Sequence, residues 1–232
     1  MKSIVIITAG GSGTRIKSKT KKQFIEIMNR PLLFWTIDKF VHHPEIDQII
    51  ITLPNSEIEN YKEIIEQEYK TNIISIIAGG MQRQDSVYNA LLICQEDTDF
   101  VLIHDGVRPF ISKNEISNLM KKAYSKHAVL PVYKVKNTIK KVCEDKVLET
   151  ISRDNLVNVL TPQVFQYKLI KQCHEKAKSI NLYCTDDAAL LEYFGYPVYT
   201  LECSSVNFKI TDKIDLEIAT YLIQNNLIKE KK

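Results

Sequence analysis

Short, almost wholly apolar runs recur along the first two-thirds of the chain and set the strongest limit on its fold. They are "SIVIIT" (3–8), "QIIITL" (48–53), "NIISIIA" (72–78), "FVLIHD" (100–105) and "AVLPVY" (128–133). Segments of helical periodicity separate the first four runs, at 31–42, 56–70 and 84–95. Strands this apolar are buried on both faces, as in parallel sheets covered by helices. The pattern predicts an α/β fold with a doubly wound, mostly parallel sheet.

The pattern changes from Lys134 onward. The stretch "KNTIKKVCEDKVLETISR" alternates apolar and polar residues around the turn signal Glu144-Asp145, which predicts a two-stranded hairpin arm at about 134–153. A lone hairpin is marginal in water and needs another surface for its apolar face of Val135, Ile139 and Val147. We therefore expect the arm to cross to a second subunit of a homodimer.

Beyond the arm, helical periodicity returns at 166–179, 185–194 and 212–226, with strands expected at "PVYTLE" (197–202) and "NFKIT" (207–211). We see no linker or repeat, so residues 1–232 are expected to form a single domain that carries the arm.

Composition excludes several classes of function. A net charge of +3 on 232 residues argues against a large nucleic-acid surface. No apolar run approaches the roughly 20 residues that span a bilayer, and the first residues run directly into a strand. We expect a cytoplasmic protein that contacts neither membrane nor nucleic acid. The five cysteines are scattered without a C-x-x-C pair, which indicates neither a disulfide framework nor a zinc site.

Six of the seven glycines fall in three clusters, each directly after a predicted parallel strand. Glycine lets backbone N–H groups approach a ligand closely, and ligands of open α/β sheets bind beyond the carboxyl ends of the strands. Any one cluster could be a simple turn, but together the three predict one binding crevice. The clusters are Gly10, Gly11 and Gly13; Gly79 and Gly80; and Gly106.

The first glycine loop, "TAGGSGTRIKSKTKKQ" (8–23), points to a polyphosphate ligand. Ile16 stands where a dinucleotide fingerprint needs its third glycine, and no Gly-Lys-Ser/Thr follows as a Walker A loop requires. A backbone nest followed by cations remains, and such a nest suits a triphosphate. Arg15 and Lys22 flank the loop and are the candidates for direct contact. Lysines 17, 19 and 21 are interpreted as solvated charges.

Nine motifs along the chain resemble those of the 2-C-methyl-D-erythritol 4-phosphate cytidylyltransferase family. In order between residues 9 and 211 they are "AGGSGTR", "KQF", "GGMQRQDSV", "HDGVRPF", "NTIK", "SRDNL", "LTPQVF", "TDDAALLEYFG" and "NFKIT". The resemblance implies a Rossmann-like nucleotidyltransferase. It would transfer CMP from CTP to 2-C-methyl-D-erythritol 4-phosphate, releasing pyrophosphate and forming 4-diphosphocytidyl-2-C-methyl-D-erythritol in non-mevalonate isoprenoid synthesis.

Two other functions stay open at this point. The related ribitol 5-phosphate cytidylyltransferases tend to carry extra residues between the glycine loop and its lysine, and "TDACK" in place of "TDDAA". The loop spacing and the motif sequence here favour the methylerythritol enzyme. A non-catalytic nucleotide-binding protein would keep the fold but usually lose its charged catalytic groups. The cations of the motifs are all present here.

The resemblance also implies a role for each matching residue. Arg15 and Lys22 would stabilise charge at the α-phosphorus of CTP, and Arg153 and Lys209 would grip the phosphate of the second substrate. Two polyanions must meet, so Mg²⁺ is expected, with Asp105 as its candidate ligand. The arm would carry Thr138 and Arg153 to the neighbouring subunit's substrate. The implied substrate-binding residues are Ala9, Gly10, Gly11, Gly13, Gly79, Gly80, Arg83, Ser86, Asp105, Arg108, Thr138, Thr161 and Thr185.

Some motif residues also have purely structural interpretations. His104 is expected to be a hydrogen-bonded structural residue, and Arg108 could hold its loop by pairing with a carboxylate. Thr185 could be only the N-cap of the helix that follows it. Lys209 could be an exposed strand lysine. Three further positions depart from the family pattern, namely Lys21, Met81 and Asn137.

Overall fold

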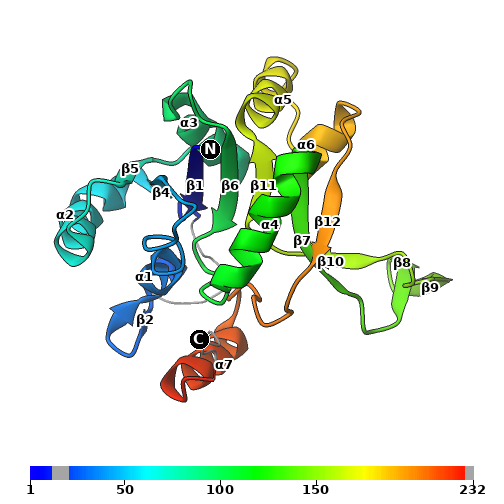
Figure 1. Ribbon diagram of the computed structural model, residues 1–232. Coiled ribbons are helices and arrows are strands. Elements are labelled where there is room, and N and C mark those ends of the chain that lie inside the picture. The colour runs from blue at the N-terminus through cyan, green and yellow to red at the C-terminus, as the bar shows by residue number, and fades with distance from the viewer. Residues whose placement is uncertain (12–20, 228–232) are drawn as a thin grey trace.

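The computed structural model describes residues 1–11 and 21–227, and its centre is an eight-stranded sheet (Figure 1). The strand order is β10-β7-β11-β6-β1-β4-β5, with β12 paired to β7. All pairings are parallel except those of β10 and β11, which run antiparallel to their neighbours. The strands are β1 (Ser3–Thr8), β4 (Gln48–Leu53), β5 (Ile74–Ala78), β6 (Phe100–Asp105), β7 (Ala128–Lys134), β10 (Val157–Val159), β11 (Gln163–Gln166) and β12 (Tyr199–Glu202).

Helices cover both faces of this sheet, as the apolar runs predict. Along β1, Val5 and Ile7 join one buried cluster while Ile4 and Ile6 join another, because successive side chains of a strand point to opposite faces. The first cluster packs under α1 (Leu32–Ile37), α2 (Ile58–Tyr69) and α4 (Lys113–Lys126). The second packs under α3 (Arg83–Ile93), α5 (Tyr167–Ser179) and α6 (Asp187–Tyr193). The doubly wound, mostly parallel sheet is thereby confirmed.

A third, smaller cluster lies where the chain leaves the carboxyl ends of the strands. It joins Ile27 and Leu32 to Val107 and to Ala219 of α7 (Lys213–Gln224), the helix at the bottom of Figure 1. The short elements η1 (Lys22–Phe24), β2 (Glu26–Ile27) and β3 (Arg30–Pro31) precede α1, and η2 (Asn55–Glu57) precedes α2. This packing fixes the start of α1 and the segment that follows β6.

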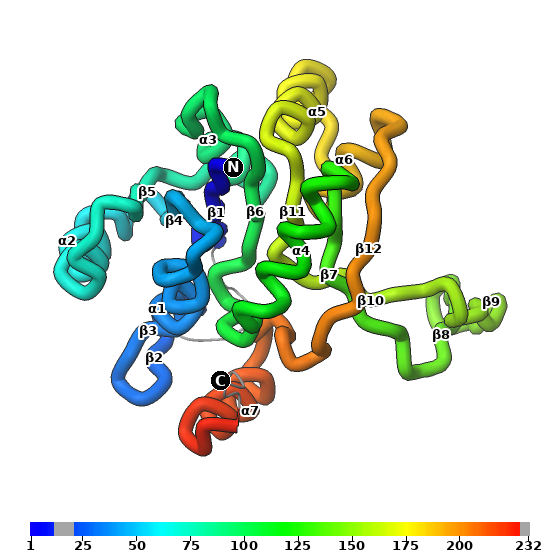
Figure 2. The backbone as a smooth tube through the Cα atoms, in the orientation of Figure 1, coloured from blue at the N-terminus to red at the C-terminus, as the bar shows by residue number. Residues whose placement is uncertain are grey.

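The predicted arm is a separate two-stranded sheet made of β8 (Ile139–Cys143) and β9 (Lys146–Ile151). Figure 2 shows it projecting from the body beside β10. Val142 and Val147 pair across the two strands, yet they leave 56% and 54% of their surface exposed. The hairpin is confirmed, and its apolar side chains find little cover within this chain.

Two expectations about secondary structure were wrong. The segment "NFKIT" forms no strand. Isolated hydrogen bonds hold it instead, including one from the Ile210 N–H to the Val107 carbonyl oxygen (3.0 Å). The helix expected over 31–42 ends at Ile37 and continues only as turns. The long helix α4 was not predicted at all. Within the described residues, no helix is long and apolar enough to cross a membrane.

Candidate active site

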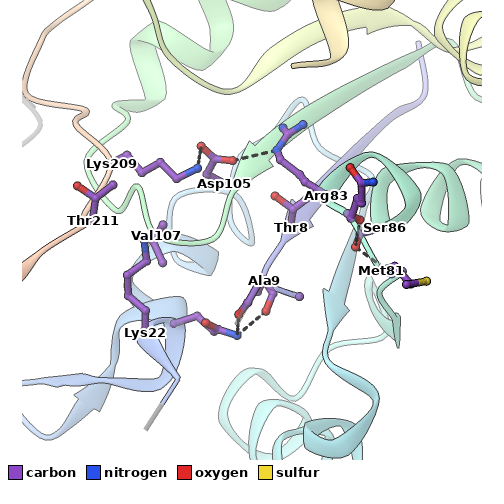
Figure 3. Close-up of a pocket in the computed structure, with 15 residues that line it drawn as sticks. Thr8, Ala9, Lys22, Met81, Arg83, Ser86, Asp105, Val107, Lys209 and Thr211 are labelled. Carbon is purple, nitrogen blue, oxygen red and sulfur yellow. Dashed lines mark hydrogen bonds and ion pairs between the residues drawn. The ribbon is translucent and has the colours of Figure 1, made fainter. Parts of the chain in front are cut away.

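A cleft of about 440 Å³ opens beyond the carboxyl ends of β1 and β6, beside the start of α3 (Figure 3). Segments far apart in sequence meet there: the glycine loop after β1, the β5–α3 connection, the end of β6 and the segment before α7. The cleft brings together nine of the residues predicted to form the site, namely Ala9, Gly10, Gly11, Lys22, Gly80, Arg83, Ser86, Asp105 and Lys209.

Close packing explains the two glycines between β5 and α3. A Cβ on Gly80 would lie 2.2 Å from the Cβ of Asp85, and one on Gly79 would lie 2.9 Å from Ser86 Oγ. The Gly80 N–H donates to Ser86 Oγ (3.0 Å), and Gln82 and Asp85 form a capping box at the start of α3. The loop is thus fixed against the helix that presents Arg83.

Gln23 holds the described start of the first glycine loop, Ala9 to Gly11, and was missed by sequence reasoning. Its buried side chain donates from Nε2 to the carbonyl oxygens of Ala9 (2.6 Å) and Gly11 (3.3 Å). Both contacts lie beside Lys22, the next residue back along the chain. The position was visible in the motif "KQF", but its burial, which gives it this role, depends on the tertiary fold. Gly13 and Arg15 lie outside the described residues.

Three cations surround the carboxylate of Asp105 at the centre of the cleft. Its Oδ1 accepts from Arg83 Nε (3.2 Å), while Oδ2 accepts from Arg108 Nε (3.0 Å) and lies 3.1 Å from Lys209 Nζ. Burial alone would raise the carboxyl pKa, but the charges of Arg83, Lys209 and Arg108 outweigh it and hold that pKa below its ordinary value. The cleft therefore presents preorganised positive charge to a ligand.

Arg83 and Arg108 are each anchored a second time. Arg83 Nη1 donates to Asp187 Oδ2 (2.6 Å), and Arg108 Nη1 donates to the Asn207 carbonyl oxygen (3.0 Å). The interpretation of Arg108 as a loop-holding residue is confirmed by its bonds at both ends. Burial opposes the charge on Arg83, but Asp187 and Asp105 together raise its pKa above the ordinary value, so its charge is secure. Sequence reasoning assigned Asp187 no function.

The expectation that Thr185 caps α6 was wrong by one residue. Asp186 is the N-cap, because its side chain accepts from the Ala189 N–H (3.0 Å) and the helix begins at Asp187. Thr185 is exposed and does not line the cleft described above. A role for it in substrate binding stays a prediction.

His104 and Thr161 belong to the support of the cleft. The Asp105 N–H donates to Thr161 Oγ1 (3.1 Å), and the Thr161 hydroxyl lies 3.0 Å from His104 Nδ1. His104 Nε2 lies 2.9 Å from the Arg108 carbonyl oxygen. The structural interpretation of His104 is thus confirmed. Thr161 is nearly buried, and in this chain its hydroxyl orients the backbone beside Asp105.

The two predicted site residues of the arm do not reach this cleft within one chain. Thr138 and Arg153 are both exposed, neither lines the cleft, and Arg153 Nη1 donates to the Lys136 carbonyl oxygen instead. Their role toward substrate, like the dimer in which they would reach a neighbouring cleft, stays a prediction.

Asp105 does not fit a resident metal ion in this arrangement. Among the residues that the structure describes, no group of three or more His, Cys, Asp or Glu side chains could hold a metal. Both oxygens of Asp105 already contact cations, which would repel Mg²⁺. A magnesium ion here would depend on phosphate oxygens for most of its ligands, as it commonly does in nucleotide sites.

A mostly parallel sheet covered by helices, with glycine loops and cations gathered at one edge, is an α/β nucleotidyltransferase-like fold. Residues 3–225 match the profile of the IspD family, 2-C-methyl-D-erythritol 4-phosphate cytidylyltransferase. Relatives of that name include proteins of Clostridium perfringens strain SM101 (41% identity; 96% of this chain, 99% of the relative) and Clostridium botulinum strain Eklund 17B (39%; 94% and 97%). The chain belongs to this family.

Solved structures agree with this assignment. The 4-diphosphocytidyl-2C-methyl-D-erythritol synthase of Anaerococcus prevotii is 32% identical and superposes with a TM-score of 0.85 over 96% of each chain. The 2-C-methyl-D-erythritol 4-phosphate cytidylyltransferase of Francisella tularensis is 31% identical, with a TM-score of 0.81 over 95% of this chain and 99% of its own.

Proposed function

We propose that the protein transfers CMP from CTP to 2-C-methyl-D-erythritol 4-phosphate, the activity named for its family. The observation that carries the proposal is the cleft itself, where Lys22, Arg83 and Lys209 from three segments of the chain line one cavity with Gly10 and Gly11. Such convergence of cations and bare backbone suits a triphosphate meeting a second phosphate. The product is 4-diphosphocytidyl-2-C-methyl-D-erythritol, a precursor for isoprenoid synthesis.

The chemistry needs no general base from the protein. A phosphomonoester has a second pKa near ~6 and is mostly dianionic at neutral pH, so its oxygen can attack the α-phosphorus of CTP directly. A new P–O bond forms as the bond to the bridging oxygen breaks, and that oxygen leaves on pyrophosphate with its electron pair. The protein's part is to position the two anions and stabilise the charge of the transition state. We assign that part to Lys22 and Arg15 at the α-phosphorus.

The second substrate's phosphate would be held by Lys209 of the cleft and by Arg153 of a neighbouring subunit's arm. The exposed apolar side chains of the arm support this homodimer. CTP would enter as its magnesium complex, because Asp105 is already surrounded by cations and the triphosphate brings oxygen ligands of its own. Bound to the triphosphate, the ion would supply Lewis acidity to the phosphates. We place the enzyme in the cytoplasm, where CTP is available.

Release of pyrophosphate tests the proposal. Purified protein is incubated with MgCTP and either 2-C-methyl-D-erythritol 4-phosphate or ribitol 5-phosphate, with Lys22→Ala protein as the inactive control. We expect release with the erythritol phosphate and a kcat/KM for ribitol 5-phosphate at least about 100-fold lower. Preference for ribitol 5-phosphate would assign the chain to the alternative activity. Binding of CTP without release with either acceptor would leave a nucleotide-binding protein.

A further inference from the structure

A buried chain of charges continues behind the active cleft from Arg83. The guanidinium of Arg83 is shared between Asp105 at the cleft and Asp187 behind it, while 29% of its side chain stays exposed. Asp187 is only 1% exposed, and a buried carboxylate needs a partner for each of its oxygens. One oxygen, Oδ2, is satisfied by Arg83. The other, Oδ1, must find its partner elsewhere.

His174 of α5 is the group that faces this second oxygen. Its Nε2 lies 3.2 Å from Asp187 Oδ1, and its side chain is fully buried. Neither atom makes a regularly aligned hydrogen bond to any described residue, so each depends on the other for compensation. The ring also stacks on Tyr88 of α3, with centroids 6.4 Å apart and planes 14° apart. Three helices therefore meet around the Asp187 carboxylate. His174 lies on the side away from the cleft, and Arg83 lies on the side toward it.

We propose that His174 is a positioning residue for CTP: through Asp187 it fixes the guanidinium of Arg83 in the nucleotide cleft. This inference rests on the proposed function, because it assumes that Arg83 contacts the nucleotide. If His174 is lost, Oδ1 of Asp187 is left buried without a partner, and the carboxylate turns to find one. Arg83 then loses its anchor behind the cleft and the orientation in which it meets CTP. His174 itself touches no substrate.

The competing explanation is that the pair only holds α3, α5 and α6 together. Both explanations predict a loss of stability when His174 is replaced, so stability cannot separate them. They differ in nucleotide binding, because only a positioning role makes the effect of His174 depend on Arg83. A double-mutant cycle measures this dependence directly.

The experiment measures the Kd for MgCTP by titration calorimetry, which needs no second substrate. His174→Phe keeps a ring but removes both nitrogens, and we expect it to raise Kd about 10-fold, the usual size of a lost charge-assisted hydrogen bond. The kcat at saturating CTP should change less than about twofold, since the transition-state cations remain. His174→Gln, which returns an N–H donor near Nε2, should restore most of the affinity.

The cycle then adds His174→Phe to an Arg83→Ala protein. We expect no further loss of affinity in the double variant, because the guanidinium that His174 orients is gone. Equal effects of His174→Phe with and without Arg83 would overturn the inference. Cys173→Ala is the matched control, since Cys173 is the buried neighbour of His174 on the same helix, and it should lower the melting temperature without changing Kd.

Two further outcomes are decisive. If His174→Phe does not fold, Asp187→Asn carries the same expectation, a raised Kd that disappears in the Arg83→Ala background. Wild-type protein that binds CTP while every His174 and Asp187 variant binds it equally well would overturn the positioning role alone. Wild-type protein that binds no CTP would overturn the proposed function and this inference together.

Discussion

The hydrogen-bond partners of His104 determine which of its ring nitrogens carries the proton. Its Nε2 faces the Arg108 carbonyl oxygen, which can only accept, so Nε2 must carry the proton. Its Nδ1 then accepts from the Thr161 hydroxyl, whose oxygen in turn accepts from the Asp105 N–H. The ring is therefore neutral in the folded protein. Burial lowers the pKa of His104 to about 4, in agreement with this tautomer.

This neutral ring gives the protein a specific dependence of stability on pH. The unfolded chain binds a proton at His104 near pH ~6.5 but the folded chain only near its lower pKa, so stability is lost as the pH falls through this interval. His104→Gln keeps a donor for the Arg108 carbonyl oxygen and cannot titrate. Between about pH 7 and 4, the wild type should lose roughly 3 kcal/mol more unfolding free energy than the variant. Urea denaturation at several pH values measures this, and parallel profiles would contradict it.

The cations of the first loop should differ strongly in their effect on catalysis. Removing a preorganised cation from a developing charge costs about 10²–10³ in kcat, so Lys22→Ala and Arg15→Ala should lose turnover at this level while staying folded. Lys17→Ala and Lys19→Ala are the matched controls on the same loop and should change kcat less than about threefold. Steady-state pyrophosphate release compares the four proteins. Equal, small losses of kcat in all four variants would mean that the loop cations are solvated charges without a catalytic role.

The sequence allowed us to identify functional residues more reliably than the side-chain contacts they make. Glycines, Lys22 and Lys209 stand out because their chemistry is visible in a motif. Asp187 and Gln23 were missed because both act through burial, and burial depends on which helix packs over them. The surplus of cations around Asp105 was also out of reach, since its partners Arg83 and Lys209 lie 22 and 104 positions away from it in sequence.

At the scale of elements, the buried apolar strands could be predicted from the sequence. Amphipathic helices and segments without a partner strand were harder to predict. β1, β4 and β6 occupy the ranges predicted for them, because a strand buried on both faces is apolar throughout. Helix α4 was missed although Ser112 and Glu115 form a capping box, a signature visible in the sequence. "NFKIT" was mistaken for a strand because alternation also arises in an extended segment that buries Ile210 against the body without a partner strand.

The connection between β5 and α3 gives an element-scale prediction. A Cβ at Gly80 would strike Asp85 and push the loop off the capping box of α3, so Gly80→Ala should lower the free energy of unfolding by about 1–3 kcal/mol. Gly11→Ala is the matched control, because its Cβ meets no described atom within 4 Å. It should change stability by less than about 0.5 kcal/mol. Denaturation in urea decides between them, and equal losses would mean that the loop adapts.

At the scale of the whole molecule, the cleft and the arm each lack something that the other could supply within a dimer. The cleft gathers Lys22, Arg83 and Lys209, while Thr138 and Arg153 stand exposed on the arm and its base. The arm in turn exposes Val142 and Val147, which a partner could cover. A two-fold dimer satisfies both, because each arm then reaches the other subunit by the same contact.

Mixing two inactive proteins tests this shared site. Lys22→Ala disables the cleft of its own subunit, and Arg153→Ala is expected to disable the cleft of the neighbour. When the two proteins are unfolded and refolded together, half of the dimers are mixed, and each mixed dimer then has one doubly altered site and one intact site. Random pairing should restore about a quarter of the wild-type rate of pyrophosphate release. If Arg153 served its own subunit, every site in every dimer would keep one lesion. Mixed dimers that are seen by native mass spectrometry but stay inactive would therefore rule out an active site completed by the partner's arm.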